Sequence, residues 1–167
     1  MKKKYKFLCL IICLLSFSVA LFGLNISILI VQNDGTEKVS VASKTFENEI
    51  LNYFFDNGHI VSNEPVSLYD NYDFAAKQGF YAAVDGFMDY FVEIKIDYVE
   101  KSTNPDAVLL SNIKSVEYKI KKVSTGEVLC ESGKIIPKLE GISNQSIGFS
   151  NFAYDVAKNI SNNIYGK

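Results

Sequence analysis

A histidine, a cysteine and two pairs of aspartates are the residues of this sequence whose types could carry out chemistry. His59 is the only histidine, and Cys130 is the only cysteine outside the amino-terminal segment. A cysteine and a histidine form a nucleophile–base pair where a fold brings them together. His59, however, follows a predicted helix, where a cation suits the negative end of the helix dipole. Cys130 alternates with apolar residues, as a small core side chain on a strand does, so we interpret both residues as structural.

The paired acids of the sequence are Asp70 with Asp73 and Asp85 with Asp89. General acid–base catalysis needs two carboxylates that converge on one cleft, which sequence spacing does not show. Neither pair follows the alternating oxygen-ligand spacing of a calcium loop, and the sequence lacks the ligands for a zinc site. We therefore predict no catalytic, cofactor-binding or metal-binding residues, and we interpret these acids as solvated turn residues.

The amino-terminal segment combines lysines with a long apolar run. Four lysines lie within the first six residues, and Phe7–Val31 then contains no charged residue. The small residues Ser18, Ala20 and Gly23 follow the densest part of the run, which is the order typical of a cleavable signal peptide.

Two topologies are compatible with this segment. In the favoured one, residues 1–23 are a signal peptide, residues 24–167 form the domain, and the mature chain starts between Leu21 and Asn25. The protein is then exported to the periplasm or the cell envelope. The alternative is an uncleaved anchor in the inner membrane, because about 20 apolar residues are enough to span a bilayer. Membrane association through the amino-terminal segment therefore stays open.

Composition and charge limit the number of domains and the class of partner. A chain of 167 residues, 48% of them hydrophobic, is long enough for one domain with its own core. Removing residues 1–23 takes away four of the 17 basic residues and none of the 19 acids, so the remaining domain is acidic. The sequence contains no arginine. Because nucleic-acid binding requires clustered cations, we predict no nucleic-acid partner.

Hydrophobic periodicity predicts the secondary structure. Apolar residues at three- and four-residue spacing predict helices over residues 43–59, 68–79 and 143–167. Alternating or β-branched stretches predict strands over residues 25–31, 59–65, 80–84 and 90–98, and a hairpin over residues 115–136. We predict an α+β (α/β-like) fold with a single mixed β-sheet, on one face of which two long helices and one short helix pack.

The strand predicted over residues 90–98 has the clearest alternation. Its predicted core face holds Tyr90, Val92, Ile94, Ile96 and Tyr98. Its other face holds Glu93, Lys95 and Asp97, which we expect to meet solvent.

The order of these elements resembles a known family. The matching segments are Ala75–Gly79, Tyr81–Gly86, Tyr90–Tyr98 and Thr125–Leu129. They resemble the family that includes the amino-terminal domain of TolB, the lipoprotein activators of penicillin-binding proteins and the curli-secretion protein CsgG. In that pattern a helix leads into a strand ending in Gly, and a second strand is followed by a hairpin with a turn like TGEVL. The resemblance implies an envelope-side domain that works by binding other proteins.

Three hypotheses for the function follow. The leading one is an exported, non-enzymatic protein of the bacterial cell envelope that acts as a protein-binding or assembly module and has an envelope protein as its partner. The second is a small exported hydrolase or ligand-binding protein that uses Asp85, Asp89 or Cys130. The third is a structural protein tethered to the membrane by its amino-terminal segment.

Overall fold

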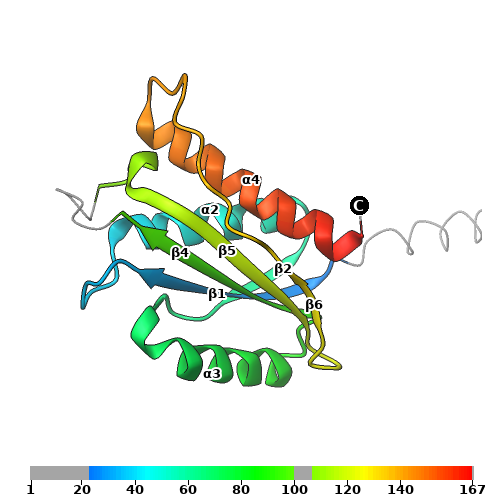
Figure 1. The fold of residues 1–167 in the computed structure, drawn as a ribbon. Coiled ribbons are helices and arrows are strands. Elements are labelled where there is room, and N and C mark those ends of the chain that lie inside the picture. Colours follow the sequence, from blue (N-terminus) through cyan, green and yellow to red (C-terminus); the bar gives the residue numbers. More distant parts are fainter. Residues whose placement is uncertain (1–22, 100–106, 167) are drawn as a thin grey trace, which may run out of the picture.

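A six-stranded mixed sheet forms the centre of the fold, and the computed structural model describes residues 23–99 and 107–166 (Figure 1). The strands are β1 (Asn25–Asn33), β2 (Ile60–Asn63), β3 (Ser67–Leu68), β4 (Tyr90–Tyr98), β5 (Ile113–Lys122) and β6 (Val128–Glu131). The helices are α2 (Val41–Asp56), α3 (Tyr72–Asp85) and α4 (Gln145–Tyr165), with short 3-10 turns at Tyr69–Asn71 and Leu110–Asn112. The predicted α+β class with a mixed sheet is confirmed. Apart from Gly23, the predicted signal peptide lies outside the described residues.

The sheet has a parallel half and an antiparallel half. Its strand order is β2-β1-β4-β5-β6, and β3 pairs with β1. β1 runs parallel to β2, β3 and β4, whereas β4–β5 and β5–β6 are antiparallel pairs. β1 therefore lies inside the sheet, between β2 and β4, and seven of its nine residues are buried, which explains the apolar run Ile28–Val31 at its middle.

Helices cover both faces of the sheet, which corrects the expectation that they share one face. α2 and α4 lie on one face and α3 lies on the other (Figure 1). The larger core lies under α2 and α4 and contains Ile28, Val92 and Phe46, all with no exposed surface. A smaller core lies under α3 around Leu29 and Phe91. The two sets alternate along β1 and β4, as side chains on opposite faces of a strand must.

The predicted strand over residues 80–84 is wrong, because these residues continue α3 to Asp85. Ala76, Gly79 and Ala83 are the buried residues of this helix and form its sheet-facing side. A Cβ at Gly79 would lie 3.0 Å from the ring of Phe91, so this glycine lets the helix approach the sheet closely instead of ending the helix.

The remaining helices follow the predicted apolar faces with shifted ends. Ser40, and not Ser43 or Thr45, caps α2, because its side chain accepts a hydrogen bond from the Ser43 backbone N–H. Gly58 has the left-handed backbone expected after this helix, with φ 81°. Within the described part of the chain, no helix is both long enough and apolar enough to cross a membrane.

Candidate functional site

The outer face of β4 is covered by α3, which corrects the prediction that this face meets solvent. Glu93 is only 3% exposed, and Asp97 is also buried. The alternation that placed these residues opposite Val92 and Ile94 is confirmed. The alternation could not show that a helix also packs on the second face.

A buried carboxylate organises this face. The Tyr72 hydroxyl of α3 donates a 2.5 Å hydrogen bond to Glu93 Oε2, and Lys121 Nζ of β5 lies 2.5 Å from Glu93 Oε1. Burial, and then the hydrogen bond to Glu93, raises the pKa of Tyr72 far above its ordinary value. Tyr72 therefore stays protonated and acts as a donor, so this triad links α3 to the sheet and offers no nucleophile.

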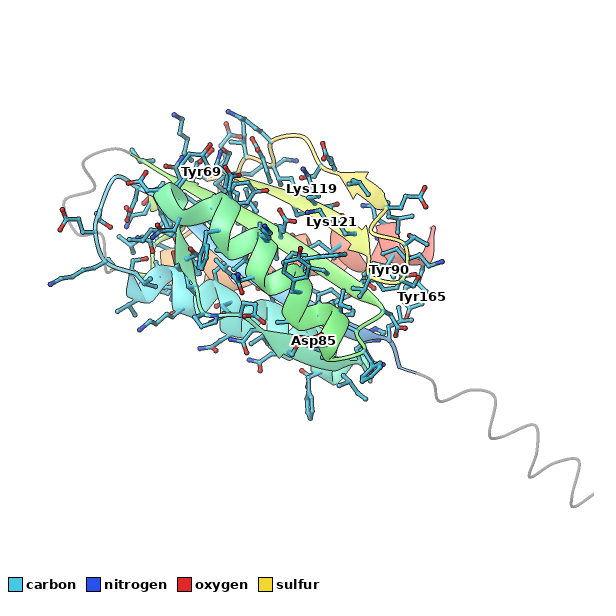
Figure 2. All side chains as sticks on the ribbon, turned by 90° about the horizontal axis from the view of Figure 1, so that it is seen from below. Tyr69, Asp85, Tyr90, Lys119, Lys121 and Tyr165 are labelled. Atoms are coloured by element: carbon cyan, nitrogen blue, oxygen red, sulfur yellow. The ribbon has the colours of Figure 1, made fainter. Side chains whose placement is uncertain are left out.

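The lysines around the triad also form ion pairs with nearby carboxylates. Lys119 Nζ lies 2.7 Å from Glu131 Oε1, and this hydrogen bond raises the pKa of Lys119. Lys95 Nζ lies 3.3 Å from Asp97 Oδ1 and 4.9 Å from the centre of the Tyr69 ring. A cavity of about 250 Å³ lies among these groups, and its lining includes Tyr69, Tyr72, Glu93, Lys95, Lys119 and Glu131. Figure 2 labels Tyr69, Lys119 and Lys121 on this face.

Asp97 stays ionised at the end of this network. Burial acts to raise its pKa, but hydrogen bonds from Asn33, Lys95 and Ser115 outweigh burial and lower it. Because each acid of the cluster has a cation or donor beside it, the cluster is best explained as a polar seam between α3 and the sheet.

The structure does not bring His59 and Cys130 together. His59 directly precedes β2 and Cys130 lies in β6, and these are the two edge strands of the sheet order. The surroundings of His59 also favour its neutral form over the cation. Its Nδ1 accepts a 3.2 Å hydrogen bond from the Leu24 backbone N–H, and burial lowers its pKa. The expectation of a cation at the end of the helix is therefore wrong.

The paired acids lie on turns and helix ends. Asp70 and Asp73 are exposed in the 3-10 turn and in the first turn of α3. Asp85 ends α3, and Asp89 Oδ2 accepts a 2.8 Å hydrogen bond from the Asn25 backbone N–H, which fixes the start of β1. Cys130 packs against the core under α2 and α4, on the face opposite α3. Among residues 23–99 and 107–166, no three His, Cys, Asp or Glu side chains gather as metal ligands would.

An open groove beside α4 is a second concave feature lined by described residues. The volume of the groove is about 540 Å³. It lies between α4 and residues 135–144, the segment that precedes this helix. Ile136 of the segment and Ile147 of α4 line it and are exposed, and the partly buried Phe152 of α4 also lines it. A Cβ at Gly148 would lie 2.9 Å from a methyl group of Ile142, so the glycine lets this segment pack directly on the helix.

This groove was hard to predict from the sequence. Its apolar residues come partly from α4 and partly from a segment that contains Pro137 and Gly141 and follows neither the helix period nor the strand period. The one available signal was the isoleucine pair Ile135–Ile136 at the end of the predicted hairpin, where two apolar residues in a row break the strand alternation. Ile135 bridges to Val116 of β5, which leaves Ile136 to face outward.

Fold and site together define an α+β domain with a mixed sheet, helices on both faces and an apolar groove beside its last helix. A model of a protein family described only as "Uncharacterised protein" matches residues 25–167, and the chain belongs to that family. No curated protein matches the sequence.

Several solved structures have a similar fold. A PelC dodecamer from Paraburkholderia phytofirmans matches with a TM-score of 0.51 at 18% identity, over 83% of this chain and 86% of that one. At this identity the likeness shows the fold alone. TolB from Acinetobacter baumannii matches with a TM-score of 0.46 at 12% identity, over 87% of this chain and 29% of TolB. Lipoprotein GNA1162 from Neisseria meningitidis matches with a TM-score of 0.43 at 14% identity, over 81% of this chain and 98% of that one. These last two likenesses are too weak to carry an argument.

Proposed function

We propose that this chain is an exported, non-enzymatic protein of the bacterial cell envelope and acts as a binding or assembly module. The observation that carries the proposal is the open groove beside α4, whose lining includes the exposed Ile136 and Ile147 and the partly buried Phe152. Concave apolar surfaces rimmed by polar groups are the usual seats of protein contacts. Lys138 and Asp155 supply such polar groups along the same groove.

The competing hydrolase hypothesis has no comparable support. It needs Asp85, Asp89 or Cys130 to converge on one cleft. Instead, Cys130 packs under α2 and α4, Asp85 ends the helix on the opposite face, and Asp89 bonds the start of β1. A reaction centre would also need a base or nucleophile that is not already used in a structural hydrogen bond or in core packing.

We propose a second copy of this chain as the occupant of the groove. PelC, whose fold is similar, was crystallised as a dodecamer. That similarity concerns the fold and identifies no interface, so it supports testing self-assembly first. A different envelope protein in the same groove is the alternative outcome.

Site-specific photo-crosslinking tests the proposal. A photoreactive phenylalanine analogue at Ile136 of the full chain should give one discrete adduct in envelope fractions, at twice the mass of the chain. The matched control places the analogue at Phe74, which is exposed on α3 on the opposite face of the sheet. Introducing Ile147→Glu into the Ile136 reporter should abolish the adduct, because it places a charge across the groove.

The two reporters together decide the question. No adduct at Ile136 beyond that at Phe74 would refute the groove as a docking site, and so would an adduct that Ile147→Glu leaves unchanged. An adduct of another mass that disappears in the Ile147→Glu variant would keep the groove but replace the second copy with a different protein.

A further inference from the structure

One end of the domain gathers the start of the described chain and the ends of all three helices. The Leu24 backbone N–H bonds His59 Nδ1, and the Asn25 backbone N–H bonds Asp89. The Tyr165 hydroxyl lies 3.5 Å from His59 Nε2. We call this region, which contains Leu24, His59, Phe87 and Tyr165, the Gly23 end. Figure 2 shows Asp85, Tyr90 and Tyr165 there, away from Tyr69.

Large apolar side chains are exposed at the Gly23 end. Phe87 is 86% exposed, more than any other large apolar side chain in the described part of the chain. Phe55, in the last turn of α2, and Ile60, the first residue of β2, are also largely exposed. These three come from separate elements, so no single amphipathic helix explains them.

The backbone holds Phe87 in an unfavourable conformation. Its φ of 55° makes it the single non-glycine residue with a positive φ among those described. Left-handed backbone is disfavoured for a bulky side chain and is found preferentially at functional positions. The turn is fixed on both sides, because the Phe87 and Met88 N–H groups bond the Val84 and Ala83 carbonyls. The fold thus holds an aromatic ring outward where a glycine would be easier to accommodate.

The sequence that precedes the Gly23 end indicates what covers it. Residues 7–22 are uncharged and mostly apolar, and they join the domain at this end. In the uncleaved topology, the alternative to a signal peptide, these residues stay in the bilayer, and only a few residues separate the lipid from β1. The exposed Phe87, Phe55 and Ile60 would then be the part of the domain nearest the lipid.

We infer that the Gly23 end rests on a lipid bilayer, with the ring of Phe87 inserted among the acyl chains. Exposed aromatic and aliphatic side chains at the base of a tethered domain are what such contact requires. The charged side chains exposed at this end include Asp56, Asp85, Asp89, Glu127 and Lys122, among which acids outnumber the lysine. The contact is therefore apolar and does not depend on anionic lipids. This inference concerns a different surface from the α4 groove and does not rest on it.

The absence of tryptophan from the sequence makes a direct test possible. The full chain carrying Phe87→Trp is reconstituted in phosphatidylcholine vesicles whose acyl chains are brominated. Bromine quenches tryptophan only at close range, so we expect strong quenching and blue-shifted emission. The matched control is Phe74→Trp, near the other end of α3, where the native ring is 69% exposed. It should be quenched by acrylamide in the water and not by bromine.

A second reporter, Ile60→Trp, tests the same end of the domain from β2, so that the result does not depend on the Phe87→Trp substitution alone. If both Gly23-end reporters respond to acrylamide as Phe74→Trp does, the end faces water and the inference is wrong. Protection of both from bromine and acrylamide alike would mean that protein covers this end, and that result also overturns it. Quenching by bromine that appears only with anionic phosphatidylglycerol would contradict the apolar character of the contact.

Discussion

At the scale of single residues, His59 links the end of α2 to Leu24, the residue that precedes β1. Its Nδ1 accepts the Leu24 backbone N–H, and a proton on that nitrogen would face another donor. Burial also lowers the pKa of His59 in the folded state. The unfolded state therefore binds more protons near neutral pH. The contribution of His59 to stability is present above its unfolded pKa of about 6.5 and is lost as the pH falls through the folded pKa.

We expect the free energy of unfolding to decrease as the pH is lowered from about 7.5 to about 5, and we expect His59→Gln to flatten this dependence. Gln can still accept from Leu24 but does not titrate. Glu47 acts in the opposite sense, because burial raises its pKa and its contribution is lost as the pH rises. The difference between wild type and variant isolates His59. Urea titrations at several pH values provide the measurement, and parallel curves for the two proteins would contradict the assignment.

Phe87 presents the opposite case, a residue whose local conformation lowers stability. Phe87→Gly should relieve the positive φ, whereas Phe87→Ala removes the ring but keeps the strained Cβ. We expect the Gly variant to be more stable than the Ala variant by about 0.5–1 kcal/mol. Thermal melts of the two variants measure this difference directly. Equal melting temperatures would show that the turn carries no strain.

At the scale of elements, α3 shows what the sequence pattern could and could not predict. The strand of residues 90–98 was predictable because its alternation extends over nine residues. Residues 80–84 were misassigned because a short apolar run fits a buried strand and a buried helix equally well. The small residues Ala76, Gly79 and Ala83 were the missed signal, since their spacing forms one face of a helix. The burial of Glu93 could not be predicted without knowing where α3 docks.

The polar seam under α3 gives a prediction about docking. Tyr72→Phe removes the hydroxyl that donates to the buried Glu93, and a lost hydrogen bond to a charged group costs about 1.5–3 kcal/mol. Tyr69→Phe is the matched control, because its side chain is substantially exposed, and it should change stability little. In a Glu93→Gln background the effect of Tyr72→Phe should shrink. Urea unfolding of the four proteins forms the cycle, and a Tyr72→Phe effect that persists in full would mean that packing, not the hydrogen bond, holds α3.

At the scale of the whole molecule, the sequence predicted the elements better than the surfaces they form together. The mixed sheet and the long helices follow from periodicity within single segments. The groove and the Gly23 end do not, because each is assembled from residues far apart in the chain, such as Ile136 with Ile147 and Leu24 with His59. Their chemistry becomes visible only when the topology places those segments together.

The start of the domain is the last prediction, because it bears on export and on stability together. The backbone groups of Leu24 and Asn25 bond His59, Ile60 and Asp89, which lie at the starts of β2 and β4. A chain that begins at Leu21 should keep these bonds, whereas one that begins at Ile26 loses four of them. At about 0.5–1.5 kcal/mol for each bond, the shorter chain should be less stable by about 2–6 kcal/mol. Urea melts of the two chains measure the loss, and intact mass of the exported protein shows where a signal peptidase cuts. Because the domain needs Leu24, any cleavage should leave it in place, as does the uncleaved chain on which the bilayer contact rests. An exported protein that begins after Asn25 with unchanged stability would contradict this account of β1.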